Sequence, residues 1–118
     1  KRNSDGSFER RKASLFLLGT FQRPDIDFYD TYAPVADFVV VRIVIATACA
    51  KQWTIHHLDV KSAFLNGYLD EDIYMSLPRE YSLPNGTACK LKRSIYGLRQ
   101  APRAWNKRLT DDLKLSGF

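Results

Sequence analysis

The sequence predicts an α+β fold from the order of its candidate strands and helices. Two further observations support this class. The chain has 118 residues, of which 45% are hydrophobic and 13% aromatic, so it can bury one modest core. Several short runs are rich in β-branched and aromatic residues, and two longer segments carry apolar residues at helical spacing. We therefore expect a single globular unit.

The N-terminal segment predicts an arm followed by a strand. The first residues are polar with a turn signal at Asp5-Gly6, and we expect residues 1–10 to form a flexible arm. Residues 13–18 are a short apolar run that Gly19 ends, which predicts a strand.

The middle of the chain predicts a helix, a strand and a helical turn. Asp37 is a candidate N-cap for a helix that ends near Gln52. Apolar side chains occupy all faces of this helix and Arg42 is its only interior charge, so we expect burial almost all round. Residues 53–60 alternate in a way that suits a strand, and residues 62–66 could form a helical turn.

A hairpin is predicted next. Residues 72–77 and 89–92 are candidate strands joined across an Asn85-Gly86 turn. The acidic residues 70–72 before it could bind a cation, but such a cluster more often marks an exposed turn.

The last element is a predicted helix over residues 101–115. Pro102 is tolerated in the first turn of a helix, and Gly117 is placed to end it. One apolar stripe runs along this helix through Ala101, Trp105, Leu109 and Leu113.

Charge and cysteine content limit the classes of function. Lysine and arginine outnumber aspartate and glutamate by 18 to 13, with clusters at the N-terminus and in residues 90–108, which suggests a polyanionic partner. A net charge of +5 is also common on soluble domains. Cys49 and Cys89 fit neither a disulfide framework nor a C-x-x-C metal site, which favours a reducing compartment. No apolar run approaches a membrane span and no signal-peptide pattern occurs, so we expect an intracellular protein with no membrane partner.

Asp59 is the strongest single candidate for chemistry. An acid at the end of an otherwise apolar strand must be solvated, paired or bound to a metal. A structural aspartate that caps the next turn is the alternative. The adjacent His56 and His57 point to opposite sides of a strand, so they cannot chelate one ion together.

Several long motifs carry a family resemblance. The chain reads LDVKSAFLNG around Asp59 and KLKRSIYGLRQAPRAW at residues 90–105. DGSFERRKA near the start, DTYAPVADFVVVRI in the middle and the final Gly-Phe occur in the order and spacing of the same family. Together these motifs resemble the reverse transcriptase domain of the Pol polyprotein of Ty1/copia retrotransposons. The resemblance implies the fingers and part of the palm of a right-hand polymerase, with residues 11–52 mainly in the fingers and residues 53–118 in both.

The resemblance also implies a metal and a nucleotide site. Asp59 would be the first metal-binding carboxylate of the palm, and the Val60 carbonyl would help it hold Mg²⁺ against the incoming triphosphate. Phe64 would pack under the sugar and exclude a 2′-hydroxyl. An ordinary core aromatic is the alternative for Phe64. Lys12 would face the triphosphate, but Ser14 replaces the arginine of the family pattern K-A-R-L-V, which puts nucleotide binding in doubt.

The segment before the last helix would touch the template and the new base pair. Tyr96 and Gly97 would contact the nucleotide, since tyrosine offers a flat face and glycine permits close approach. Arg99, Gln100 and Pro102 would contact template and primer. By themselves these residues also suit a plain junction between a loop and a helix.

The chain is expected to be incomplete as a catalyst. In the family, the second and third carboxylates form a Y-x-D-D hairpin beyond the Gly-Phe at which this chain ends. The pair Asp111-Asp112 is predicted to lie on a solvated helix face instead, and one carboxylate cannot assemble a two-metal site. The complete enzyme would use RNA or DNA template-primer, deoxynucleoside triphosphates and the rest of the Pol polyprotein, in cytoplasmic virus-like particles or the nucleus. A basic module that binds nucleic acid or protein without catalysis, and a degenerate copy without a selected role, are the alternatives.

Overall fold

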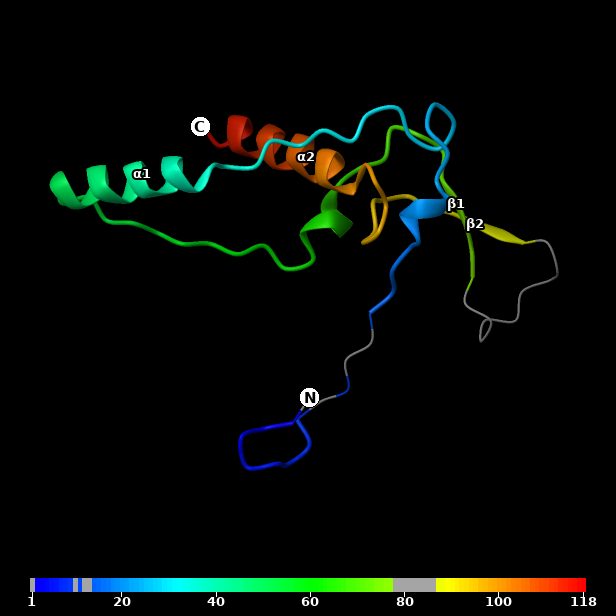
Figure 1. Cartoon of the computed structure of the whole chain (residues 1–118), viewed down its shortest axis with the longest axis horizontal. Coiled ribbons are helices and arrows are strands. Elements are labelled where there is room, and N and C mark those ends of the chain that lie inside the picture. Colours follow the sequence, from blue (N-terminus) through cyan, green and yellow to red (C-terminus); the bar gives the residue numbers. More distant parts are fainter. Residues whose placement is uncertain (1, 10, 12–13, 78–86) are drawn as a thin grey trace.

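The fold consists of two helices and one small hairpin connected by long loops. A computed structural model describes residues 2–9, 11, 14–77 and 87–118. Figure 1 shows the elements in chain order. They are η1 (Gly19–Phe21), α1 (Phe38–Ala50), η2 (Ala63–Asn66), β1 (Tyr74–Ser76), β2 (Ala88–Lys90) and α2 (Ala101–Leu115), where η denotes a 3-10 turn. The order of helices and strands confirms the α+β class. No helix in the described part of the chain has the length and apolar character needed to cross a membrane.

The predicted hairpin is confirmed in a shorter form. Strands β1 and β2 pair antiparallel with Met75 opposite Cys89. Met75 is buried while its neighbours Tyr74 and Ser76 are exposed, as expected of a strand with one covered face. The predicted turn at residues 85–86 lies outside the described residues.

The other two predicted strands are wrong for the described residues. Residues 14–18 and 53–60 are extended, but neither is assigned as a strand. A strand requires a ladder of hydrogen bonds to a neighbouring backbone, and among the described residues these segments make isolated backbone bonds. Leu17 N–H donates to the Tyr96 carbonyl at 2.9 Å, and Trp53 N–H donates to Ala48 at the end of α1.

Helix α2 follows the sequence pattern at both ends. Pro102 lies in its first turn, and Gly117 beyond its last residue has φ +89°, the left-handed conformation typical of a helix end. The Phe118 N–H then donates back to the Leu113 carbonyl at 3.1 Å. Burial is greatest at Ala101, which is 1% exposed, and it decreases toward the C-terminal end of the predicted stripe.

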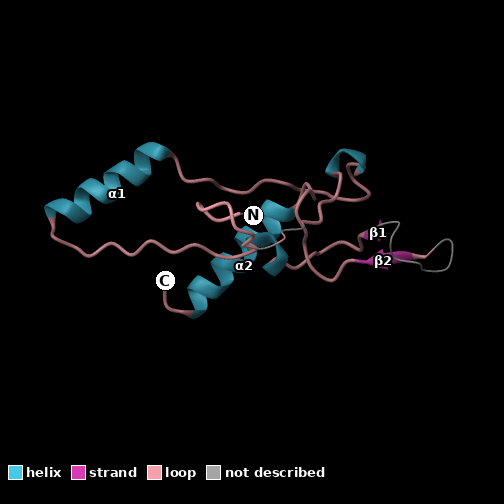
Figure 2. Ribbon diagram, turned by 90° about the horizontal axis from the view of Figure 1, so that it is seen from below, coloured by secondary structure: helices cyan, strands magenta, loops and turns pink. Residues whose placement is uncertain are grey.

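Helix α1 is capped as predicted, but it is not buried. The Asp37 carboxylate accepts a hydrogen bond from Val39 N–H at 2.7 Å, and Ala48 is the one buried residue of the helix. The prediction of burial all round is wrong here because no other described helix or strand packs against α1. Both views show α1 set apart on two long loops (Figures 1 and 2). The radius of gyration is 19.3 Å, whereas a compact domain of this length has about 13–14 Å.

The core lies where the hairpin, η2 and the start of α2 meet. Its buried centre is Ile73, Leu98 and Ala101. Around these pack the half-buried side chains of Leu17, Phe64, Leu69, Leu91 and Ile95. Two of the sequence motifs that carry the family resemblance, residues 58–67 and 90–105, therefore meet at this core, and Leu17 of the segment 14–18 joins them there.

Candidate nucleotide and template site

Asp59 lies on the exposed extended segment 53–60. Its carboxylate makes no hydrogen bond or ion pair with another described residue, so the alternative of a structural cap is not what the structure shows. Val60 beside it is 45% exposed. Ser62 then adopts a left-handed conformation, with φ +53°, that turns the chain into η2. Asp59 is thus accessible from solvent directly before the turn that carries Phe64.

The described residues do not form a complete Mg²⁺ site. Mg²⁺ takes about six oxygen ligands, commonly one or two carboxylates together with water and phosphate oxygens. No group of three or more possible ligands occurs among the described residues. The Asp111-Asp112 pair is confirmed on α2, where Asp112 accepts from Arg108 at 2.9 Å, one helical turn away. Asp59 could therefore supply one ligand of a shared ion and no more.

Phe64 is held firmly next to Tyr96. The two ring centroids lie 5.1 Å apart with the planes tilted by 58°. The turn η2 is anchored from both sides, because Ser94 N–H donates to the Gly67 carbonyl at 2.9 Å and a Cβ at Gly67 would lie 2.8 Å from the Ala104 backbone. Phe64 is half-buried against the core, so the sugar-contact role and the core role that the sequence left open are both compatible with its position.

Gly97 permits an unusually close approach of two backbones. It has φ +95°, and a Cβ there would overlap the carbonyl oxygen of Leu17. The same contact includes the hydrogen bond from Leu17 N–H to the Tyr96 carbonyl at 2.9 Å. Glycine is therefore needed at this position because the Leu17 backbone lies against it. The close approach to a nucleotide that the motif predicts for Gly97 stays a prediction.

Phe16 joins this aromatic group and was missed by the sequence reasoning. Its ring centroid lies 6.1 Å from that of Tyr96 in an edge arrangement, and its side chain is 63% exposed. A signal was available, because Phe16 stands where the family pattern K-A-R-L-V ends in valine. We call Phe16, Phe64 and Tyr96 the aromatic triad. Phe16 is the exposed ring of the triad, whereas Phe64 and Tyr96 are half-buried. Aromatic rings that solvent can reach can stack with a nucleobase or pack against a sugar.

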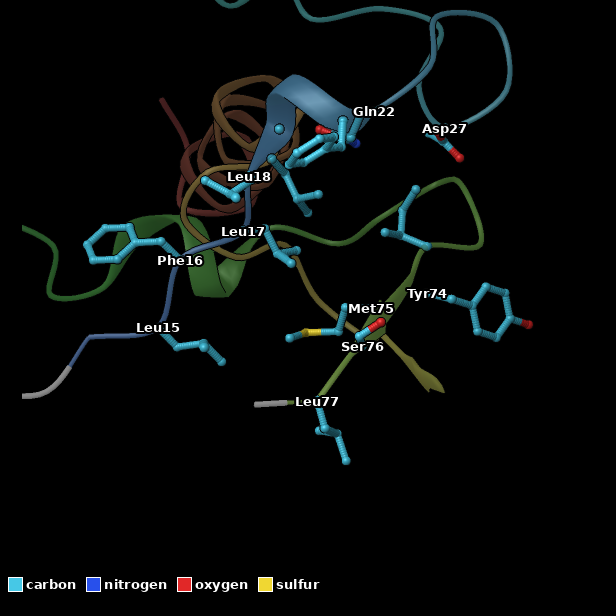
Figure 3. A pocket seen from close by; sticks show the side chains of 14 residues that line it. Leu15, Phe16, Leu17, Leu18, Gln22, Asp27, Tyr74, Met75, Ser76 and Leu77 are labelled. Carbon is cyan, nitrogen blue, oxygen red and sulfur yellow. The ribbon is translucent and has the colours of Figure 1, made fainter. Parts of the chain in front are cut away.

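A cavity of about 500 Å³ lies beside the triad, between residues 15–22 and β1. Figure 3 shows Leu17 and Met75 facing one another across it, while Phe16 points to the other side of its segment. The lining is mostly aliphatic and aromatic. This lining suits the binding of an apolar group and provides no arrangement of side chains for catalysis.

The three residues assigned to the template differ in accessibility. Arg99 is exposed, but its Nε donates to the Gly19 carbonyl at 2.8 Å and its guanidinium lies 5.5 Å from the centre of the Phe28 ring. Gln100 is 3% exposed and its amide is hydrogen-bonded within the protein. Pro102 is half-buried in the first turn of α2. Gln100 therefore has hydrogen-bond partners within the protein, and the template contact predicted for it stays a prediction.

The basic cluster of residues 90–108 is partly neutralised. Four of its side chains pair with carboxylates: Lys90 with Asp72, Arg103 with Asp30, Lys107 with Asp70 and Arg108 with Asp112. A backbone hydrogen bond from Tyr32 and the charge of Arg103 lower the pKa of Asp30 below its usual value. Asp70 and Asp72 of the acidic residues 70–72 are therefore partners of basic side chains here, and the structure does not favour a strongly cationic binding face. Lys12 lies outside the described residues, and Ser14 is exposed.

Comparisons with known proteins agree with these motifs. The family described as "Reverse transcriptase (RNA-dependent DNA polymerase)" matches residues 1–118. The chain is 46% identical to the retrovirus-related Pol polyprotein from transposon RE1 of Arabidopsis thaliana and 43% identical to that from transposon RE2, in both cases over the whole chain and 8% of the relative. It is 36% identical to the Pol polyprotein from transposon TNT 1-94 of Nicotiana tabacum, over 97% of the chain and 9% of the relative. The chain thus spans less than a tenth of these relatives, and no solved structure matches it significantly.

Proposed function

The chain belongs to the reverse transcriptase (RNA-dependent DNA polymerase) family, and we propose that it forms the fingers and the first half of the palm of a retrotransposon polymerase. That polymerase adds deoxynucleotides to a primer on an RNA or DNA template. One observation carries the proposal beyond family membership. Two motifs far apart in the sequence bring Phe64 and Tyr96 to a ring separation of 5.1 Å. The segment just before Phe64 carries Asp59, whose carboxylate has no hydrogen bond or ion pair with another described residue.

We assign the roles in this site as follows. Asp59, with the Val60 carbonyl, supplies one carboxylate toward Mg²⁺, which in polymerases stabilises the charge on the attacking and leaving oxygens. Phe64 limits the space under the sugar and so favours deoxynucleotides over ribonucleotides. Tyr96 supports Phe64 by ring contact, and Lys12 faces the triphosphate.

The 118-residue chain alone is proposed to be inactive. Nucleotidyl transfer uses two divalent ions held by several carboxylates, and the described residues provide one suitable acid. Ser14, in place of an arginine, removes a bidentate phosphate contact as well. Catalysis therefore depends on acids supplied by other parts of the polypeptide.

Other parts of the Pol polyprotein are the proposed partners of the exposed apolar surfaces. Val39 and Ile43 of α1 are 59% and 58% exposed, and Leu58 on the segment before Asp59 is 86% exposed. Apolar areas of this extent are uncommon on the surface of a monomeric soluble domain. The small fraction of the relatives' length that this chain spans leaves ample protein to cover them.

Primer extension tests the proposal in the polymerase polypeptide that carries this chain. The wild type is expected to add deoxynucleotides in Mg²⁺ and to reject ribonucleotides. Phe64→Ala should lower that discrimination on the order of 10- to 100-fold, because a small side chain leaves room for a 2′-hydroxyl. Phe8→Ala is the matched control, since Phe8 is 64% exposed in a turn away from the core. Absence of deoxynucleotide addition by the wild type would contradict the polymerase assignment, and an unchanged ratio in Phe64→Ala would contradict the sugar role.

A further inference from the structure

Two glutamines connect the start of the chain to the turn before α2. Gln22 Nε2 donates to Gln100 Oε1 at 2.9 Å, and Gln100 Nε2 donates to the Asp27 carbonyl at 3.0 Å. On the other side, Arg99 N–H donates to Gln22 Oε1 at 2.8 Å and Arg99 Nε donates to the Gly19 carbonyl at 2.8 Å. All four bonds join residues that are more than 70 positions apart. We call the side chains of Gln22 and Gln100, with these partners, the glutamine latch.

The latch needs a primary amide at both positions. Each amide accepts on one side and donates on the other, so the bonds run in one direction from Arg99 N–H to the Asp27 carbonyl. Glutamate would lose the donor and leucine would lose both groups. Because Gln100 is 3% exposed, water cannot easily replace a lost partner there. The two side chains therefore act as one unit.

The latch holds two backbones in contact. A Cβ at Gly19 would overlap the Gly97 carbonyl oxygen, and a Cβ at Gly97 would overlap the Leu17 carbonyl oxygen. Glycine at both positions permits this approach, but it does not hold the segments together. Side-chain hydrogen bonds directly beside the contact supply that restraint.

The aromatic triad depends on the same contact. Leu17 N–H donates to the Tyr96 carbonyl, and the neighbouring Phe16 ring lies 6.1 Å from the Tyr96 ring. Tyr96 in turn contacts Phe64 at 5.1 Å. A shift of the early segment relative to the turn would therefore change where Phe16 and Tyr96 meet.

We propose that Gln22 and Gln100 are positioning residues for nucleotide addition, which set the geometry of the aromatic triad through their hydrogen bonds to each other and to the backbone. The effect on nucleotide addition rests on the proposed polymerase function. The restraint on the two backbone segments rests on the hydrogen bonds alone.

The test compares Gln22→Leu, Gln100→Leu and the double variant in the polymerase polypeptide. A positioning role predicts that each single variant raises the KM for deoxynucleotides about tenfold, since misplaced contacts weaken binding in the productive geometry. A variant that only folds less well would lower apparent kcat through the active fraction and leave KM unchanged. The double variant should resemble either single variant, because residues that act as a unit give non-additive effects. Gln52→Leu, at an exposed glutamine, is the matched control and should leave KM as in the wild type.

Hydrogen exchange provides a readout that is independent of activity. Exchange of the Arg99 and Leu17 amides should become faster in Gln100→Leu and stay unchanged in Gln52→Leu. Unchanged exchange at both amides, or unchanged KM in an active enzyme, would overturn the latch. If the wild type adds no nucleotide, the polymerase function fails. Faster exchange at Arg99 and Leu17 would then still support the structural part of the latch.

Discussion

Replacing Gly97 by alanine removes two properties of glycine: its freedom to adopt a positive φ and its lack of a Cβ atom. Gly97 has φ +95°, and an added Cβ would overlap the Leu17 carbonyl oxygen and lie 2.8 Å from the carbonyl carbon. Both obstacles are backbone atoms, which cannot swing away as a side chain would. We therefore expect Gly97→Ala to push the early segment away from the turn before α2.

Two contributions set the expected loss in the free energy of unfolding of Gly97→Ala. A residue other than glycine pays about 1–2 kcal/mol to adopt the left-handed conformation. Separation of the backbones also breaks the hydrogen bond from Leu17 N–H to the Tyr96 carbonyl, which contributes about 0.5–1.5 kcal/mol. Gly97→Ala should thus lower the free energy of unfolding by roughly 1.5–3.5 kcal/mol, before any loss of Leu17 packing in the core.

Gly6→Ala is the matched control for the conformational contribution. Gly6 has φ +83°, close to that of Gly97, but nothing lies within 4 Å of an added Cβ. It occupies a turn closed by the Arg2–Phe8 bridge, so its substitution tests the cost of the backbone conformation without a close backbone contact. Urea denaturation followed by the fluorescence of Trp53 and Trp105 measures both variants. Equal midpoints for Gly97→Ala and Gly6→Ala would refute the close-approach argument.

Three further outcomes are expected. Leu98→Ala should lower the free energy of unfolding by about 2–5 kcal/mol, since Leu98 is 5% exposed in the core. Leu115→Ala, at an 87% exposed site, should change the free energy of unfolding by less than about 0.5 kcal/mol. Equal effects of the two substitutions in urea denaturation would contradict the assignment of Leu98 to the core. Asp37→Ala should cost α1 about 1 kcal/mol of local stability, seen as faster amide exchange along the helix, and unchanged exchange would mean that the cap is not formed. Hydrogen bonds from Arg23 lower the pKa of Asp27 below its ordinary value of 3.8. The contribution of this contact to the free energy of unfolding is therefore present above pH 3.8 and is lost as the pH falls through the lowered pKa. An NMR titration of Asp27 should therefore have its midpoint below 3.8 and move up in Arg23→Ala, and a midpoint at or above 3.8 in the wild type would contradict the contact.

Elements with local signals could be predicted from the sequence. The ends of α2 follow from Pro102 and Gly117, and the start of α1 follows from Asp37, because each signal acts within one helical turn. The hairpin was predicted because the Asn85-Gly86 turn signal lies between two candidate strands. Burial of α1 was predicted wrongly, since an apolar helix shows a need for partners but the residues around it decide whether it has them.

The candidate site could be predicted only in part. The motifs indicate Asp59, Phe64 and Tyr96 as site residues, and their roles remain proposals. The contacts of Gln100 come from Gln22 and Asp27, 78 and 73 positions away, and no local pattern indicates pairs at such separation. A motif therefore shows which residues matter to a family, while their contacts depend on segments that the motif does not contain.

The most direct test of the account is Mg²⁺-dependent primer extension by Asp59→Asn in the polymerase polypeptide. Asparagine keeps the size of the side chain but removes the charge that attracts a divalent ion. We expect extension to fall on the order of 100-fold or more, while Asp111→Asn on the exposed face of α2 keeps wild-type activity. Wild-type extension by Asp59→Asn would contradict the claim that this acid is a metal ligand of the polymerase.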